Sequence, residues 1–302
     1  MATESGSAGF LDEYRRERIA GLAGRIRRNS KAVVGLTIIV VLVVLAVFSP
    51  MLISQERANQ MNVQDRFAPP SAEYPFGTDN FGRDMFSRVL LGVRISLYIG
   101  LTSVTIAGVV GVPLGGLAGY AGGGLDDLIM RTMDVIMSFP PILVAMTITA
   151  VIGPTLTNAV IAIGIVYIPY FARVTRSEVI SVAQEEFVEA SQALGERDSY
   201  VLFREVLPNA AAPIIVQASI SISFAILAAA GLSFLGLGAQ PPTPAWGLML
   251  QQAKQYLAQA PWMAIFPGLG IATTVLGFNL FGDGIRDVLD PNASAEMGAF
   301  DE

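Results

Sequence analysis

The sequence predicts an all-α, polytopic membrane protein with about six transmembrane helices, and three observations lead to this prediction. Charged residues make up 15% of the 302 residues, whereas ordinary globular domains carry about 25%. Hydrophobic residues make up 53%, and the mean hydropathy is +0.56. Several apolar runs approach the roughly 20 residues that cross a bilayer. They lack the alternation of barrel strands, so we expect helices.

The expected spans follow one another along the chain. The first is aliphatic and aromatic without interruption from Ile38 to Phe48, which is too long for a signal-peptide core and predicts a retained anchor. The second is rich in glycine, which lets neighbouring helices approach closely in lipid. Pro140 and Pro141 stand near the start of the third, and three further apolar runs follow. We place the six spans at residues 32–53, 95–120, 135–152, 158–172, 211–235 and 263–281.

These spans divide the chain into parts with an expected orientation. Most of the 19 Lys and Arg residues fall in segments that are cytoplasmic if both termini lie inside, and basic residues favour the cytoplasmic side. The arginines of the one long outer loop are balanced by acidic residues. The expected parts are a cytoplasmic tail at 1–31, the first helix at 32–53, an extracytoplasmic loop at 54–93, a membrane core at 94–287 and a C-terminal tail at 288–302.

The residue types that are missing exclude several kinds of chemistry. The chain has no histidine and no cysteine, which excludes thiolate nucleophiles, zinc sites with imidazole or thiolate ligands, and Ser-His-Asp relays. Neither Lys31 nor Lys254 follows a glycine, so a Walker A loop is missing. The net charge of −6 makes nucleic acid an unsuitable partner. We therefore predict no catalytic, cofactor-binding or metal-ligating residue and no enzyme activity in this chain.

The cytoplasmic stretch 177–208 predicts a short helix–turn–helix. Apolar residues recur at helical spacing, and Gly195 then offers the left-handed conformation that ends a helix. Asp198 or Ser199 is expected to cap the next helix, and Pro208 ends it. An ordinary connecting loop is an equal alternative on composition alone. The apolar positions of the first helix are Val179, Val182, Phe187, Ala190 and Leu194.

This stretch contains Glu-Ala-Ser, then a glycine after three residues, then Leu-Pro. The pattern resembles the EAA signature of bacterial and archaeal ABC importer permeases, which reads Glu-Ala-Ala, three residues, Gly, nine residues and Ile-x-Leu-Pro. Ser191 replaces the second alanine, and Glu205 stands where isoleucine is usual. The resemblance implies the type I ABC importer permease fold, in which this helix pair couples to a groove of the ATPase subunit. The coupling residues that it implies are Glu189, Ala190, Ser191, Gly195, Leu207 and Pro208.

Three further blocks narrow the resemblance. They lie at 74–97, 232–247 and 279–291 and open with Tyr-Pro-Phe-Gly, Leu-Ser-Phe-Leu and Asn-Leu-Phe-Gly. They are similar to blocks of dipeptide, oligopeptide and nickel permeases, and the first span resembles that of the "C"-type subunit. The resemblance implies an ATP-driven importer in the cell membrane. Its implied partners are a second permease, two ATP-binding cassette subunits that hydrolyse ATP, and an extracytoplasmic substrate-binding protein.

Polar side chains inside the spans suggest a translocation path, because they are costly in lipid and usually face a cavity or a partner. Gln217, Ser221 and Phe224 share one face of the fifth span by helical spacing, and we predict that they line the path. Serines also fill helix–helix contacts, which remains the alternative. Arg131 and Asp134 are expected to form an interfacial ion pair.

The outer block 77–94 is predicted to form an amphipathic helix on the membrane surface, where a binding protein could dock. Phe81, Met85, Arg88 and Gly92 would line one side of it.

Two other classes of function stay open at this point. An ion-coupled secondary transporter would show internal inverted repeats and an ion site of its own, and neither is evident in the sequence. A membrane enzyme would show convergent acid–base residues. The blocks are shared by permeases for different solutes, so the sequence leaves the substrate undetermined among peptides, nickel complexes and other small solutes.

Overall fold

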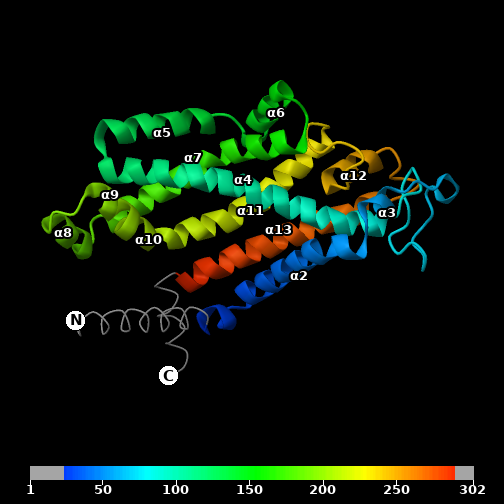
Figure 1. Ribbon diagram of the computed structural model, residues 1–302, viewed down its shortest axis with the longest axis horizontal. Coiled ribbons are helices and arrows are strands. Elements are labelled where there is room, and N and C mark those ends of the chain that lie inside the picture. Colours follow the sequence, from blue (N-terminus) through cyan, green and yellow to red (C-terminus); the bar gives the residue numbers. More distant parts are fainter. Residues whose placement is uncertain (1–23, 290–302) are drawn as a thin grey trace.

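The protein is a bundle of long helices, described over residues 24–289 by a computed structural model (Figure 1). Within this described part, the β structure is limited to an isolated bridge between Thr78 and Asp84. Helices α5 (Gly123–Met137) and α6 (Pro141–Ile152) meet at 85° and together can form one crossing. The helices long and apolar enough to cross a membrane singly are α2 (Ser30–Leu52), α4 (Met85–Ala121), α7 (Leu156–Val182), α11 (Ala211–Phe234) and α13 (Trp262–Leu289). The predicted all-α class with about six spans is confirmed.

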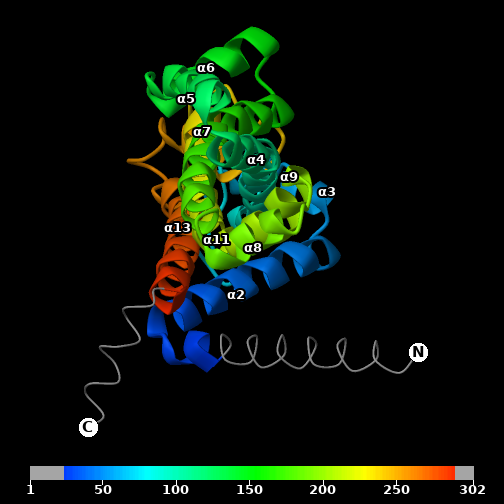
Figure 2. The same ribbon diagram turned by 90° about the vertical axis from the view of Figure 1, so that its left-hand side faces the viewer.

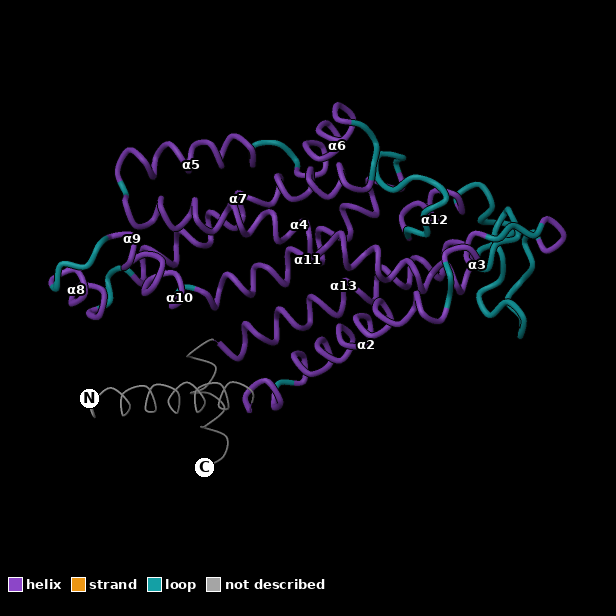
Figure 3. The backbone as a smooth tube through the Cα atoms, in the orientation of Figure 1, coloured by secondary structure: helices purple, strands orange, loops and turns teal. Residues whose placement is uncertain are grey.

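The shorter helices gather at the two ends of the bundle, where most loops also lie (Figure 3). One end carries α3 (Gln55–Asn59), the 3₁₀ turn Val63–Asp65 and α12 (Trp246–Ala253); we name it the outer cap. The other end carries α8 (Glu186–Ala193), α9 (Asp198–Tyr200), the π-helix Val201–Val206 and α10 (Leu207–Asn209). Helix α2 begins and α13 ends toward this second end, where Lys31 Nζ and Asp287 Oδ2 are 3.0 Å apart.

Glycines let the central helices approach closely. On α4, Gly111, Gly115 and Gly119 recur every fourth residue and face the backbone of α7. A Cβ atom on Gly111 would lie 2.6 Å from the carbonyl oxygen of Ile168, and one on Gly119 would lie 2.7 Å from that of Arg176. Small residues at this spacing allow backbone contact between membrane helices, so α4 and α7 form a tight pair.

The first helix packs in the same way against the last. Gly35 of α2 lies against the backbone of Phe281, and Gly284 of α13 lies against that of Ala32. Figure 2 shows α2 and α13 on one side of α4 and α7, with α5 and α6 on the other. The predicted retained anchor is therefore an integral member of the bundle.

The second span begins ten residues earlier than predicted. Asp84 caps α4 by accepting hydrogen bonds from the backbone N–H groups of Phe86 and Ser87 at 3.1 and 3.2 Å, so the helix starts at Met85. The prediction of a separate amphipathic helix on the membrane surface is wrong. Phe81 lies before the helix, while Met85, Arg88 and Gly92 lie inside a continuous span and are buried.

The third and fourth spans also differ from the prediction. The third span, expected as one helix over 135–152, is broken between Met137 and Pro141, because proline disfavours the helical conformation of the residue before it and removes a backbone donor. The fourth span continues to Val182 rather than ending at 172. Its extension contains Arg173 and Arg176, which are paired with aspartates on α5.

Candidate functional site

The helix–turn–helix was predicted at 177–208, and we name this stretch the coupling segment. Its part after Val182 protrudes from the bundle beyond the end of α7 (Figure 1). Its first helix is not continuous with residues 178–182 as predicted, because α7 ends at Val182 and a turn precedes α8. Gly195 has a φ of +82° and ends the turn after α8, as predicted. Neither Asp198 nor Ser199 caps the next helix, whose N-cap position is Arg197.

A small hydrophobic cluster joins the coupling segment to the spans. Its fully buried members come from α7, α8, the π-helix and the residue just before α11, and Tyr120 at the end of α4 packs against them. Burial of apolar surface is the main stabilising term for such a contact. The segment is thus attached to three spans at once. The cluster consists of Val179, Val188, Val201, Leu202, Val206 and Ala210.

The six predicted coupling residues divide into an outward and an inward set. Ser191 is 8% exposed and Leu207 is half-buried. Phe187 and Leu194, two of the apolar residues at helical spacing, are 44% and 85% exposed, because a short helix has only one face to bury and Val188 and Ser191 occupy it. The outward-facing predicted residues are Glu189, Ala190, Gly195 and Pro208.

The outward face of α8 therefore combines apolar side chains with negative charge. Glu185, Glu186 and Glu189 are exposed beside Phe187. Acidic residues in the first turn of a helix are stabilised by the helix dipole. Such a face complements an apolar groove with a basic rim on another protein.

Two ion pairs join α5 to the base of α7, next to the coupling segment. The Nε and Nη2 atoms of Arg176 donate to the two carboxylate oxygens of Asp126 at 2.5 and 2.6 Å. Arg173 Nη2 lies 2.6 Å from Asp134 Oδ1. The predicted pair between Arg131 and Asp134 is wrong, because Arg131 instead lies 3.8 Å from Asp127, one turn away on the same helix.

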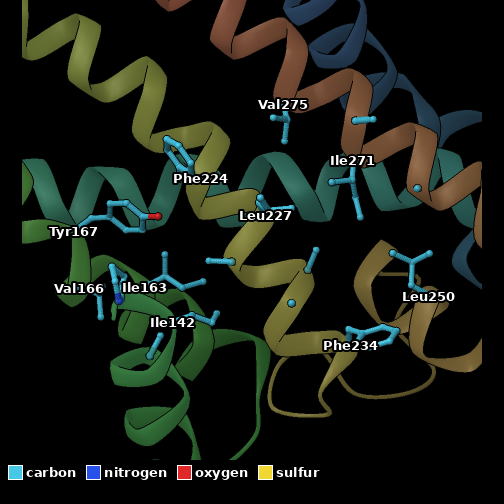
Figure 4. A pocket seen from close by; sticks show the side chains of 17 residues that line it. Ile142, Ile163, Val166, Tyr167, Phe224, Leu227, Phe234, Leu250, Ile271 and Val275 are labelled. Carbon is cyan, nitrogen blue, oxygen red and sulfur yellow. The ribbon is translucent and has the colours of Figure 1, made fainter. Parts of the chain in front are cut away.

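An apolar cavity of about 820 Å³ opens between the spans (Figure 4). Helices α6, α7, α11, α12 and α13 contribute its walls, and Tyr167 carries the hydroxyl among its aliphatic and aromatic lining. Phe224 of α11 lies on this cavity. Other lining residues include Ile142, Ile163, Leu227, Ile271 and Val275.

Gln217 and Ser221 lie elsewhere on α11. Gln217 Nε2 donates to Ser221 Oγ at 3.0 Å, and Ser221 is 1% exposed. Ser223, on the same helix, donates to the carbonyl of Val275 at 3.2 Å. The structure thus brings one of the three predicted path residues to the cavity, and helix–helix contact explains Ser223.

The outer cap contains a buried charge cluster that the sequence reasoning missed. Asp79, Arg83 and Arg88 are each at most 2% exposed. Arg83 Nε donates to Asp79 Oδ2 at 2.6 Å, and Arg88 Nε lies 4.0 Å from the same oxygen. Asp79 Oδ1 also accepts the backbone N–H groups of Phe81 and Arg83. The pattern that could have indicated this cluster is an aspartate followed by two arginines, between Gly77 and Gly92. The sequence analysis instead predicted a surface helix here.

The two arginines connect distant parts of the chain. Arg88 Nη1 donates to Asn59 Oδ1 of α3 at 2.6 Å, and Arg83 Nη2 donates to Gln252 Oε1 of α12 at 3.1 Å. Trp246 Nε1 donates to the carbonyl of Val89 at 3.0 Å. Nearby, the hydrogen bond from the Tyr74 hydroxyl to Asp65 raises the pKa of Tyr74. The cap is therefore one connected body at the end of the bundle opposite the coupling segment.

The fold and its two specialised ends define a multi-pass helical membrane protein. The sequence matches the family described as "Binding-protein-dependent transport system inner membrane component" over residues 111–295. Residues 22–70 match "N-terminal TM domain of oligopeptide transport permease C". The chain belongs to this family of inner membrane components, whose members are permease subunits of ABC importers rather than enzymes. Such a permease works with ATPase subunits, a second permease and a binding protein.

Similar proteins cover nearly the whole chain. The dipeptide transport system permease protein DppC of Alkalihalophilus pseudofirmus is 49% identical over 267 residues, 88% of each chain. The probable D,D-dipeptide transport system permease protein DdpC of Escherichia coli is 42% identical over 98% of this chain and 99% of its own. The solved MetNI methionine ABC transporter has a TM-score of 0.58 at 19% identity, covering 68% of this chain and 98% of the matched one. That structure supports the fold, and the predicted ABC importer permease fold is confirmed.

Proposed function

We propose that this permease serves an ATP-driven importer of dipeptides, oligopeptides or related small solutes. The observation that carries the proposal is the protruding coupling segment, with its exposed acidic and apolar face at the end where α2 begins and α13 ends. The relatives described as dipeptide, D,D-dipeptide and glutathione permeases support a peptide-class substrate.

The proposal assigns partners to the two ends of the molecule. Two ATP-binding cassette subunits hydrolyse ATP, and one of them receives the outward face of α8. An extracytoplasmic binding protein delivers the substrate to the outer cap. A second, related permease completes the path, and no nucleic acid takes part.

The proposed orientation places both termini and the coupling segment in the cytoplasm. The exposed Arg197 and Arg204 lie in the coupling segment, and Arg286 lies near the end of α13. Basic residues favour the cytoplasmic side. Most of the predicted N-terminal tail, residues 1–23, and of the predicted C-terminal tail, residues 290–302, lies outside the described residues.

Transport in this proposal follows from the attachment of the coupling segment. Val188 of α8 packs with Val179 of α7 and with Ala210 before α11, and both spans also line the 820 Å³ cavity. Movement of α8 with the ATPase therefore moves two walls of the cavity. ATP shifts the population toward one arrangement because it binds that arrangement better.

The cavity is this subunit's proposed share of the translocation path. Phe224 is the predicted path residue that meets it. Gln217 and Ser221 contribute through the hydrogen bond between their side chains, one turn apart on α11.

Changing the coupling segment should uncouple ATP hydrolysis from transport. Glu189→Lys reverses the charge of an exposed acidic residue, and we expect about a tenfold loss of substrate-stimulated ATP hydrolysis, corresponding to one charge-assisted contact of about 1.5 kcal/mol. Gly195→Pro should act more strongly, because proline cannot adopt a φ of +82° and lacks the N–H that bonds Gln192 at 3.0 Å. The measurement is ATPase activity of the reconstituted complex with and without a dipeptide and its binding protein.

Gly124→Ala is the matched control, because a Cβ there meets open space. Unchanged stimulation in both coupling variants would count against the proposed role. The family match favours the importer over the ion-coupled secondary transporter that the sequence analysis left open. Uptake by the chain alone in proteoliposomes with an ion gradient and no ATPase would replace the importer with that alternative.

A further inference from the structure

A partly buried hydrogen bond joins the two helices of the coupling segment. Ser191 Oγ donates to Glu205 Oε1 at 2.9 Å, across 14 residues of chain. Ser191 is 8% exposed and Glu205 is half-buried. These are the two positions at which the sequence departs from the EAA pattern, so the polar residues that replace two apolar ones contact each other.

The backbone of the second helix helps to place Glu205. Residues Val201–Val206 form a π-helix, closed by the N–H of Leu207 on the carbonyl of Leu202. Pro208 lacks the N–H of the next position, and its ring crowds the carbonyl four residues earlier, so a widened turn fits here. Such turns are rare and occur often at functional sites. Asn209 Nδ2 donates to the Glu205 carbonyl at 2.7 Å and stabilises the turn.

The hydrogen bond between Ser191 and Glu205 is directional, and the hydrophobic contact of α8 is not. Val188 anchors α8 to the second helix and is fully buried, but apolar contact is not directional. The other side-chain hydrogen bond of α8, from Gln192 to the Tyr120 hydroxyl, is exposed and competes with water, so the apolar contact at Val188 does not by itself prevent rotation of the helix. Ser191 lies three residues further on the same face of α8, and its hydrogen bond has a preferred direction. Two attachment points on one face set the orientation of the other face, which carries Glu189.

We propose that the Ser191–Glu205 hydrogen bond is a lock that fixes the orientation of α8, and that Ser191 and Glu205 are positioning residues for energy transfer between the ATPase and this permease. The inference rests on the proposed coupling function. The lock makes α8 and residues 201–209 move as one body. Without it, α8 turns on Val188 and ATP hydrolysis is no longer fully transmitted to α7 and α11.

Removing Ser191 and removing Glu205 leave different polar groups without a partner. Within residues 24–289, Glu205 Oε2 is buried and has no hydrogen-bond partner, so Ser191 supplies the hydrogen bond that the carboxylate receives. Ser191→Ala leaves that buried carboxylate unsatisfied, which is the costly case. Glu205→Ile leaves a serine hydroxyl that can rotate toward a nearby carbonyl. Replacing both by apolar groups can be nearly neutral.

The test measures dipeptide molecules imported per ATP hydrolysed by the complete complex in proteoliposomes, with the amount of assembled complex determined in parallel. We expect about a tenfold lower ratio for Ser191→Ala and a smaller loss for Glu205→Ile, as removal of a buried partner implies. The double variant Ser191→Ala/Glu205→Ile should recover a ratio close to that of the unchanged protein. Glu205→Gln should also retain the ratio, because its amide oxygen still accepts the serine hydroxyl.

Gln192→Ala is the matched control, since it removes an exposed hydrogen bond from α8 to the Tyr120 hydroxyl of 3.1 Å. It should leave the ratio unchanged. An unchanged ratio in Ser191→Ala, or losses that simply add in the double variant, would overturn the lock. If Glu189→Lys and Gly195→Pro uncouple while Ser191→Ala does not, the lock alone fails. If none of the three uncouples, the proposed coupling function itself fails.

Discussion

Replacing Asp79 with alanine is expected to destabilise the outer cap by about 3–5 kcal/mol, the range for breaking a buried ion pair from one side. Asp79 is 2% exposed and lies between Arg83 and Arg88, which are 2% and 0% exposed. Its removal leaves two buried guanidinium groups without a counterion. Arg88 already has Nε and Nη2 without a hydrogen-bond partner among the described residues. The cluster therefore has few other hydrogen bonds that could compensate for the loss of Asp79.

The loss should spread beyond the cluster because the arginines hold separate segments together. Arg88 contacts α3 and Arg83 contacts α12. We expect residues 54–84 to become accessible to protease and the purified complex to unfold at a lower temperature. Both can be measured in detergent.

A matched control is Asp127→Ala, which also removes an aspartate paired with an arginine one turn away. That pair is exposed, with side-chain exposures of 81% for Arg131 and 71% for Asp127, and such surface pairs contribute about 0–1 kcal/mol. Equal unfolding temperatures for the two variants would show that the Asp79 cluster does not stabilise the cap.

Adding one methyl group at Gly115 is the second substitution with a large expected effect. The Cβ of alanine would overlap the carbonyl group and Cα of Ala172 on α7, and a backbone cannot turn aside as a flexible side chain can. Overpacking of this kind costs about 1–3 kcal/mol, occasionally more. We expect Gly115→Ala to separate α4 from α7, lower the amount of assembled complex and weaken coupling, because α7 leads into α8.

Gly108→Ala makes the same change on the same helix. A Cβ at Gly108 would lie 3.8 Å from the ring of Phe171, which is ordinary van der Waals contact. Its expected stability is equal to that of the unchanged protein. Thermal unfolding of the two variants in the same detergent tests the difference. Equal destabilisation would show that the close approach of the α4 and α7 backbones at Gly115 is not the cause.

Local patterns predicted the parts of the fold that depend on local physics. The apolar run Ile38–Phe48 predicted α2 because a bilayer-length apolar segment forms a helix wherever it packs. Gly195 ends the turn after α8 because the left-handed conformation favours glycine over any other residue. The residues 189–208 were recognised as one unit by their resemblance to the EAA signature.

The errors occurred where a distant segment decides the outcome. Arg88 was expected on a membrane surface, but Asp79, Asn59 and the carbonyl of Pro242 surround it inside the protein. Asp134 was paired with its neighbour on the same helix, whereas Arg173, 39 residues away, is its partner. Phe187 and Leu194 have the spacing of an inward face, yet only Val188 and Ser191 find a surface to pack on.

Sequence patterns alone predicted a helical protein that crosses a membrane several times, has no Walker A loop and carries a helix–turn–helix between two spans. Hydropathy, missing residue types and glycine conformation are local properties, and they are readable without a fold. The packing of distant segments was needed to show which charges are buried, where the third span bends, and that Ser191 meets Glu205. Those outcomes depend on which surfaces meet. Burial makes an unpaired charge or polar group costly, and the partner that satisfies it often comes from a segment far away in the chain.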